Sequence, residues 1–265
     1  MKKAVYIFWL VLVLLFIYVP ILVLAVYSFT DASMVGAGIS AFSFDNYIHL
    51  FANEDLRNMI FGTLLLAVVC ATLSTVLATF GAIGAFYSKK LTKSLLNTAN
   101  EIPVVNADIV TGFSVCILLI VILRINKDTF IPLGIGHIVL SAPFVYLSIL
   151  PKLKQMDNSL YEAALDLGAT PCQALFKVVL PQLMPGIMSG FMLAVTLSLD
   201  DYFVTTYTKP SSFDTISTYV VNATKGSQTE VKTALWALST LIFLAVLAAV
   251  ILMNTLSVKK KGGKR

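Results

Sequence analysis

Four carboxylates lie within or at the edges of long apolar stretches of this 265-residue chain: Glu101, Asp108, Asp200 and Asp201. A charge near the middle of a bilayer costs about 2.5–3.5 kcal/mol on insertion scales, so each side chain needs a partner or a water-filled path. The adjacent Asp pair is followed by Tyr202. Because carboxylates supply negative charge and aromatic faces attract cations by about 0.5–2 kcal/mol, these residue types indicate a pathway for a cationic solute.

Each acid also has a structural explanation, and both explanations stay open. Glu101 can pair with a lysine on the inner side of the membrane, and Asp108 can hydrogen-bond a neighbouring helix. In a continuous helix Asp108 would lie about 22 Å along its span, near the midplane. Ser198 shares a helical face with Asp201 and Thr205, which makes Ser198 a further candidate for the pathway. The Asp pair itself can lie in the wet outer interface.

The composition shows why a membrane has to be considered. Hydrophobic residues make up 58% of the chain and charged residues only 12%, whereas an average soluble domain is about 25% charged. The mean hydropathy is +0.87. Too few charges remain to solvate a globule of this size, which excludes a soluble enzyme, a disordered regulator and a secreted scaffold. The three cysteines have no close spacing and indicate neither a disulfide framework nor a metal site.

The chain contains six apolar stretches, each long enough to cross a hydrocarbon core about 30 Å thick as a helix. They are residues 4–30, 58–88, 94–123, 129–151, 178–199 and 233–258. The first follows Lys2 and Lys3 but is far longer than the roughly 7–15 apolar residues of a signal peptide, which predicts a retained span. We therefore expect an all-α polytopic membrane protein with six transmembrane helices in a single domain, residues 1–265.

The basic residues give the expected orientation. Thirteen of the 19 Lys and Arg residues lie on the side that holds both termini, and six lie on the other. The positive-inside rule places the richer side, and so both termini, in the cytoplasm. The net charge of +5 therefore follows from topology. The basic tail at 259–265 is interpreted as a topology anchor at the membrane lipid, and we expect no nucleic acid as a partner.

The one substantial cytoplasmic loop, at about 152–177, has the pattern of two short helices. Ser159 and Glu162 fit a capping box, with Ser159 as the N-cap. Gly168 suits the position after the end of this helix, and Thr170 with Pro171 can open a second one. An apolar stripe at helical spacing consists of Leu160, Ala163, Ala164 and Leu167. The stripe needs a cover: the membrane, the ends of the spans or the groove of a partner.

This loop resembles the EAA loop of bacterial ABC importer permeases. The resemblance rests on Glu162-Ala163-Ala164, on Gly168 and on Val-Val-Leu-Pro at 178–181, which has valine where the usual pattern has isoleucine. It implies the fold of a type I ABC importer permease (MetI-like), in the bacterial plasma (inner) membrane. It also implies that Glu162, Ala163, Ala164 and Gly168 form a coupling helix that contacts a separate ATPase.

The same resemblance implies the partners: a different sister permease, an ABC ATPase dimer and an external solute-binding protein. ATP and Mg²⁺ would be bound by the ATPase, since the chain has no G-x-x-x-x-G-K-[ST] sequence. It also lacks H-E-x-x-H and G-x-S-x-G, so we expect no catalytic residue, metal site or cofactor in this chain. His49 and His137 stand alone in the sequence, and we interpret His137 as a packed, hydrogen-bonded residue within a span.

Further residues resemble the permeases of spermidine/putrescine importers, of the PotC type. They are Thr-Leu-Ser-Leu-Asp-Asp at 196–201, Lys209-Pro210, Thr-Glu-Val at 229–231 and Asn-Ala-Asp-Ile-Val at 106–110. This resemblance implies that the chain forms half of a polyamine pathway and couples it to the ATPase. Two alternatives stay open: an ABC permease for another solute, such as sugar, iron or phosphonate, and an ion-coupled carrier.

Overall fold

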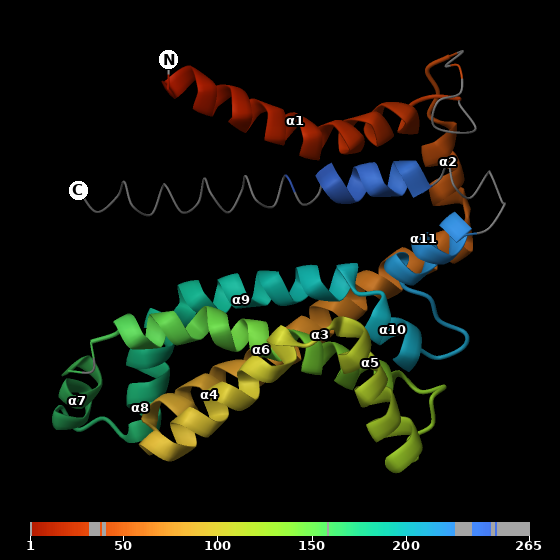
Figure 1. Ribbon diagram of the computed structural model, residues 1–265. Coiled ribbons are helices and arrows are strands. Elements are labelled where there is room, and N and C mark those ends of the chain that lie inside the picture. The colour runs from red at the N-terminus through yellow and green to blue at the C-terminus, as the bar shows by residue number, and fades with distance from the viewer. Residues whose placement is uncertain are drawn as a thin grey trace. The chain divides into compact units, whose positions relative to one another are not determined.

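The computed structural model describes residues 2–31, 38, 41–157, 159–225, 235–244 and 247. The helices are α1 (Lys2–Ser28), α2 (Asp45–Ala52), α3 (Glu54–Tyr87), α4 (Lys90–Val105), α5 (Asp108–Cys116), α6 (Phe130–Gln155), α7 (Ser159–Asp166), α8 (Pro171–Ala174), α9 (Leu180–Asp200), α10 (Phe203–Thr208) and α11 (Ile216–Lys225). Two π-helical turns extend them: Ile117–Ile122 continues α5, and Leu175–Val179 joins α8 to α9. The predicted all-α fold is confirmed (Figure 1).

The chain divides into two compact units, which are described separately. The first comprises Met1–Asn58 and Val220–Arg265, and the second comprises Met59–Tyr219. In the first unit the ring of Tyr27 packs edge-on against Trp236, with ring centroids 5.8 Å apart. The second unit holds all the candidate site residues. The expectation of a single domain stays a prediction.

Among the residues that the structure describes, four helical segments are long and apolar enough to cross a membrane: Tyr6–Ser28, Glu54–Tyr87, Phe130–Gln155 and Pro171–Asp200. The pair α4 and α5 makes a fifth if the two are counted as one broken span. Of the sixth predicted span, 233–258, the structure describes the apolar helix Leu235–Leu244. The rest of that stretch and the basic tail at 259–265 lie outside the described residues.

The expectation of one continuous helix over 94–123 is wrong. Helix α4 ends at Val105 and α5 begins at Asp108, with a bend of 108° between them. Asn106 has extended backbone angles (φ −75°, ψ 148°), and its side-chain amide donates to Thr111 Oγ1 on α5, 3.3 Å away. Pro103 has no N–H to offer the last turn of α4. Asp108 therefore lies in the first turn of α5, where the helix dipole favours a negative charge, and not far along one helix.

Helices α6 and α9 pack side by side in the second unit because one stripe of α9 carries only small residues. The stripe is buried and repeats every four residues: Gly186, Gly190, Ala194 and Ser198. A Cβ at Gly190 would lie 2.8 Å from Val145 Cγ1 and 3.2 Å from Val145 Cα, so the backbones approach too closely for a side chain. Small residues at this spacing are the usual means of close helix contact in membranes.

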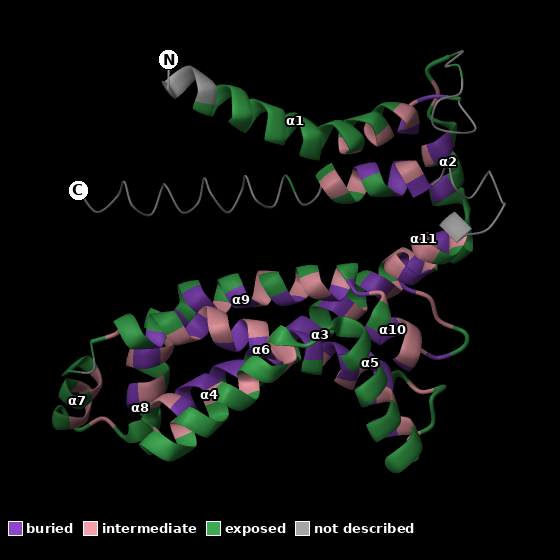
Figure 2. Cartoon of the chain, in the orientation of Figure 1, coloured by how far each residue is buried: buried purple, intermediate pink, exposed green. Residues whose placement is uncertain are grey.

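The core of the second unit lies where α3, α6 and α9 meet (Figure 2). Its fully buried members include Ala71 and Ala82 on α3, Val145 and Ile149 on α6, and Leu183 on α9. The opposite face of α3 is apolar and exposed, as expected for a surface in contact with lipid or with a partner. The core thus ties α9, which carries the Asp pair at its end, to two long spans.

Candidate site: a coupling loop and a buried polar network

The predicted coupling loop folds as helix α7, a tight break and helix α8. Helix α7 begins at Ser159, so Ser159 is the first helical residue and not the predicted N-cap. Its backbone N–H instead donates to Asp157 Oδ1, 3.0 Å away. This carboxylate lies two residues upstream and is the stronger competitor for the exposed N–H groups of the first turn. Two hydrogen bonds from Ser159 hold the pKa of Asp157 below its usual value, and the bond from the Ser159 side chain contributes more than the bond from its backbone.

Gly168 ends α7 in the left-handed conformation that its position predicted, with φ +85°. The N–H of Gly168 donates to Leu165 O at 2.9 Å, and the N–H of Ala169 donates to Ala164 O at 3.0 Å. This pair of bonds is the Schellman motif, which needs a residue with positive φ. Helix α8 then opens as predicted, with a capping box between Thr170 and Gln173.

Helix α7 turns one face to the protein and leaves the other uncovered within the chain. Tyr161, Ala164 and Leu165 are half-buried, and the Tyr161 ring lies 5.5 Å from the ring of Tyr87 at the end of α3. The exposed residues of α7 and of the turn after it are Ser159, Leu160, Glu162, Ala163, Asp166, Leu167 and Gly168. Leu167, directly after the end of α7, is 89% exposed. The expected ATPase-contact residues are therefore exposed, apart from the half-buried Ala164.

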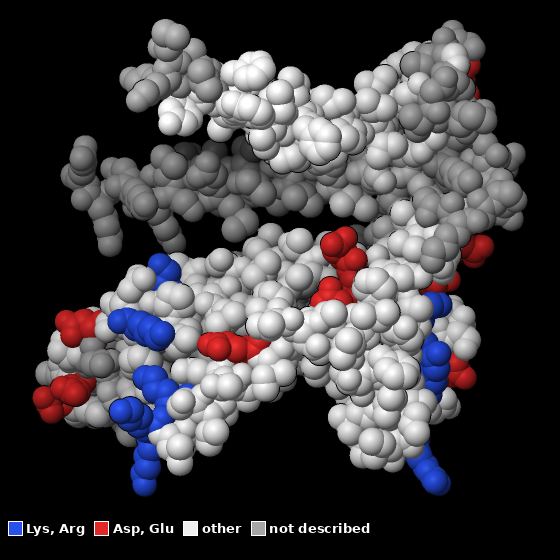
Figure 3. All heavy atoms as spheres, viewed as in Figure 1, with Lys and Arg blue, Asp and Glu red and all other residues white. Residues whose placement is uncertain are grey.

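Charged side chains gather at the same end of the second unit. Figure 3 shows Lys and Arg over the region of α4, α6 and α8, with carboxylates over α7. The lysines at the ends of these elements are Lys89, Lys90, Lys93, Lys152, Lys154 and Lys177. All are among the basic residues that the sequence assigned to the cytoplasmic side.

The two aspartates at the end of α9 have different surroundings. The side chain of Asp201 is only 3% exposed. Its Oδ1 accepts the N–H of Val204 at 3.2 Å, and its Oδ2 accepts the N–H and the hydroxyl of Thr205, each at 2.7 Å. Asp200 is exposed, and its backbone carbonyl accepts the hydroxyl of Ser217. Asp201 thus caps the start of α10, and Asp200 is the member of the pair that solvent reaches.

His137 on α6 joins this capped turn to α9. Its Nδ1 lies 2.8 Å from Ser198 Oγ, and its Nε2 lies 3.0 Å from Thr205 Oγ1 and 3.9 Å from Asp201 Oδ2. We call His137, Ser198, Asp201 and Thr205 the His137 network. The interpretation of His137 as a packed, hydrogen-bonded residue is confirmed. The chain does not continue as one helix from Ser198 to Thr205, since α9 ends at Asp200, so the predicted shared face is replaced by contacts through the imidazole.

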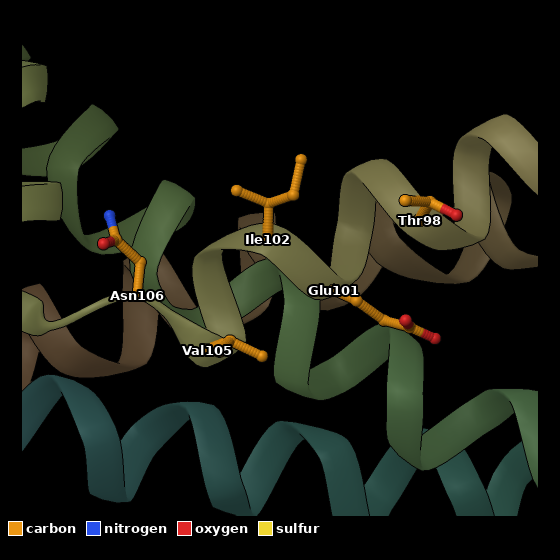
Figure 4. Close-up of a pocket in the computed structure, with 5 residues that line it drawn as sticks. All are labelled: Thr98, Glu101, Ile102, Val105 and Asn106. Carbon is orange, nitrogen blue, oxygen red and sulfur yellow. The ribbon is translucent and has the colours of Figure 1, made fainter.

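The remaining candidate residues are not members of the His137 network. Asp108 and Glu101 are exposed, and Tyr202 is half-buried with its ring 5.3 Å from that of Phe203. Within the described part of the chain, no hydrogen bond or ion pair joins Glu101 or Asp108 to the network. Glu101 lines a pocket of about 520 Å³ beside the break after α4, together with Thr98, Ile102, Val105 and Asn106. In Figure 4, Glu101 and Val105 extend from the same side of α4, and Ile102 projects from the opposite side.

Comparison with known proteins places the chain in a family. Residues 78–262 match the family of binding-protein-dependent transport system inner membrane components, and the chain belongs to this family. It is 29% identical over 252 residues to the putrescine transport system permease protein PotI of Escherichia coli (strain K12), covering 90% of this chain and 86% of that protein. It is also 29% identical over 244 residues to the spermidine/putrescine transport system permease protein PotC of Haemophilus influenzae, covering 92% and 93%.

Solved structures show the same fold. A bacterial ABC transporter involved in the import of the acidic polysaccharide alginate has a chain with a TM-score of 0.69 and 16% identity, and the match covers 95% of each chain. A second structure is that of a bacterial alginate ABC transporter in complex with an alginate pentasaccharide-bound periplasmic protein. Its chain has a TM-score of 0.67 and 19% identity, and the match covers 95% of this chain and 91% of that one. The chain is thus a multi-pass inner-membrane permease of an ABC importer with the type I (MetI-like) fold. It works with a solute-binding protein and other importer components.

Proposed function

We propose that this chain is a permease subunit of a polyamine importer and forms half of the pathway for spermidine and putrescine. The observation that carries the proposal is the 29% identity, over about nine-tenths of the chain, to permeases named for putrescine and spermidine transport. The chain spans nearly the whole length of these relatives. The match is therefore to complete permeases and not to a shared fragment.

The charges of the second unit support a cationic solute. Glu101, Asp108 and Asp200 are all exposed within the chain. Helix α9 carries no Lys or Arg between Leu180 and Asp200. Exposed carboxylates attract a polyamine and repel an acidic polymer such as alginate. We therefore infer that the two importers share a fold but not a solute.

Helix α7 supports coupling to a separate ATPase. Its exposed residues include Glu162 and Asp166, one helical turn apart, beside Leu160, Ala163 and Leu167. This surface of apolar side chains with two carboxylates suits docking in a groove. In this proposal an ATPase dimer binds and hydrolyses ATP with Mg²⁺, and this chain catalyses no covalent step. A different sister permease supplies the other half of the pathway, and an external solute-binding protein delivers the polyamine.

The structure supports a mechanical route from one end of the second unit to the other. Helix α8, the π-helical turn and α9 form one apolar segment of 30 residues, Pro171–Asp200. The EAA loop precedes this segment and Asp200 ends it (Figure 1). A displacement of α7 by the ATPase would therefore be carried along α9 to the acid that meets the solute. The proposed orientation places α7 and both termini in the cytoplasm.

Replacing Asp200 by Asn should impair polyamine uptake because it removes an exposed charge at nearly constant shape. One lost charge-assisted contact is worth about 1.5–3 kcal/mol, or about a tenfold to hundredfold weaker interaction. Asp108→Asn should impair uptake less and Glu101→Gln least. The assay is uptake of radiolabelled spermidine and putrescine, beside a sugar panel, by the complete importer. Asp45→Asn, at an exposed acid of α2, is the control. Normal polyamine uptake by the Asp200 variant, or import of a sugar instead, would contradict the proposal.

Changing the coupling loop should release the ATPase without preventing membrane insertion. Gly168→Val places a β-branched residue at φ +85°, at a cost of about 1–2 kcal/mol, whereas Gly168→Asn is tolerated because Asn adopts this conformation more readily. Glu162→Lys reverses one of the two exposed carboxylate charges of α7, the other being Asp166. We expect Gly168→Val and Glu162→Lys to co-purify with much less ATPase, and Gly168→Asn and Glu54→Lys to match the parent. Undiminished co-purification of both loop variants would show that α7 is not the docking element.

External labelling tests the orientation. In a variant without the three native cysteines, a membrane-impermeant maleimide should label Ser211→Cys in intact cells and leave Lys154→Cys unlabelled. Both positions are exposed in the structure, so a difference reports their side of the membrane. Permeabilised cells, in which both should react, supply the control. Labelling of Lys154→Cys in intact cells would reverse the proposed topology.

A further inference from the structure

The His137 network joins α6 to the consecutive helices α9 and α10, which lie much later in the sequence. His137 belongs to α6, Ser198 to α9 and Thr205 to α10, and the histidine is 61 and 68 residues from its two partners. His137 and Thr205 are 0% exposed, and Ser198 is 3% exposed. Polar groups buried this deeply are retained when they hydrogen-bond one another, because an unpaired one costs about 1–3 kcal/mol.

The protons of the network can be assigned from its partners. The carboxylate of Asp201 only accepts, so the single hydroxyl proton of Thr205 is donated to Asp201 Oδ2. Thr205 Oγ1 then accepts from Nε2–H of His137, which leaves Nδ1 to accept the hydroxyl proton of Ser198. With a neutral imidazole, every member of the network has a hydrogen-bond partner. The donors then all point the same way, from Ser198 through His137 and Thr205 to Asp201.

The network determines where α10 lies. A helix of six residues, Phe203–Thr208, is not stable alone. Asp201 caps its first N–H groups, and Thr205 attaches it to α6 through His137. Val204 fills the space left by two glycines: a Cβ at Gly112 would lie 2.9 Å from Val204 Cα, and a Cβ at Gly136 would lie 2.7 Å from Val204 Cγ1.

The same contacts fix the residues on either side of Asp200. It is the last residue of α9, two residues after Ser198 and one residue before Asp201, and both of these neighbours are members of the network. Its own carboxylate has no part in the network, and the residue is exposed. Fixing both flanks fixes the backbone of Asp200 and hence the position from which its charge acts.

We propose that His137 is a positioning residue for solute recognition: it holds the flanks of Asp200 through Ser198 and Thr205, and Asp201 belongs to this support and not to the solute-binding surface. The inference rests on the proposed function, since it takes Asp200 to be the acid that meets the polyamine. It separates two adjacent aspartates into one group that binds and one that supports.

A double-mutant cycle in the complete importer tests the positioning role. We expect Asp200→Asn to raise the KM for spermidine about tenfold, and His137→Leu to raise it by a similar factor, with the maximal rate per complex within about twofold of the parent. If His137 acts through Asp200, the double variant should be no worse than about twofold beyond either single one. Independent effects would multiply to about a hundredfold and would overturn the inference.

A conservative variant gives a second test, which distinguishes a positioning role from general destabilisation. His137→Gln keeps one acceptor and one donor and should restore the KM to within about threefold of the parent, whereas His137→Leu should not. His49→Leu, at the exposed histidine of α2, is the matched control. If His137→Leu does not insert, Ser198→Ala removes one bond of the network and supplies the same cycle. A His137→Gln protein as impaired as His137→Leu would overturn the inference.

Replacement by serine should affect polyamine uptake differently at the two aspartates. Asp201→Ser keeps an oxygen that accepts the N–H of Val204, so it should support more uptake than Asp201→Ala. Asp200→Ser should be as impaired as Asp200→Asn. Equal loss in Asp201→Ser and Asp201→Ala would show that the charge at position 201 is itself required, against the inference. A parent importer that moves no polyamine would overturn the proposed function and this inference with it, whereas failed cycles in an active importer overturn the inference alone.

Discussion

Helices within a bilayer gain little by burying apolar surface against one another, because lipid is as apolar as their side chains. What holds them is close approach and hydrogen bonding. In this permease the approach of α9 to α6 meets that requirement: Gly190 lies against Val145 where no side chain fits, and Gly186 against the backbone of Ser148. One further repeat of the stripe, after Ala194, brings Ser198 within 2.8 Å of His137. The position of α10 depends on this contact.

The arrangement connects two ends of one long segment. At one end α7 packs through Tyr161 against Tyr87, and its exposed residues include Leu160, Glu162 and Asp166. At the other end, Asp200 is held between groups that bond to α6. Helix α9 packs against α6 from Gly186 to Ser198. In the proposed function, this packing carries a displacement of α7 to the solute site.

Local patterns predicted those parts that depend on a few adjacent residues. Gly168 and the Thr170–Pro171 start of α8 were predictable because each is a terminus with its own chemistry. The N-cap of α7 was assigned to Ser159 since the capping-box spacing is correct, but Asp157 offers a carboxylate two residues earlier. The break at Asn106 was missed because apolar content is continuous across it. Pro103 and Asn106 were the available signals for that break.

Long-range contacts could not be predicted in this way. No sequence window contains both His137 and Thr205, so the burial of Asp201 was invisible, and the adjacent aspartates had to be treated alike. The likeness to polyamine permeases identified the region but not the division of roles within it. That division follows from hydrogen bonds that only the folded chain displays.

The close packing of α9 against α6 can be tested directly by adding one methyl group at Gly190. Gly190→Ala introduces a Cβ against Val145, an overpacking that costs about 1–3 kcal/mol, whereas Gly84→Ala on α3 meets no atom within 4 Å and gains helix propensity. The thermal unfolding midpoint of each purified protein in one detergent is the measurement. We expect Gly190→Ala to lower the midpoint by about 2–10 °C and Gly84→Ala to keep or raise it. Equal midpoints for the two variants would contradict the account.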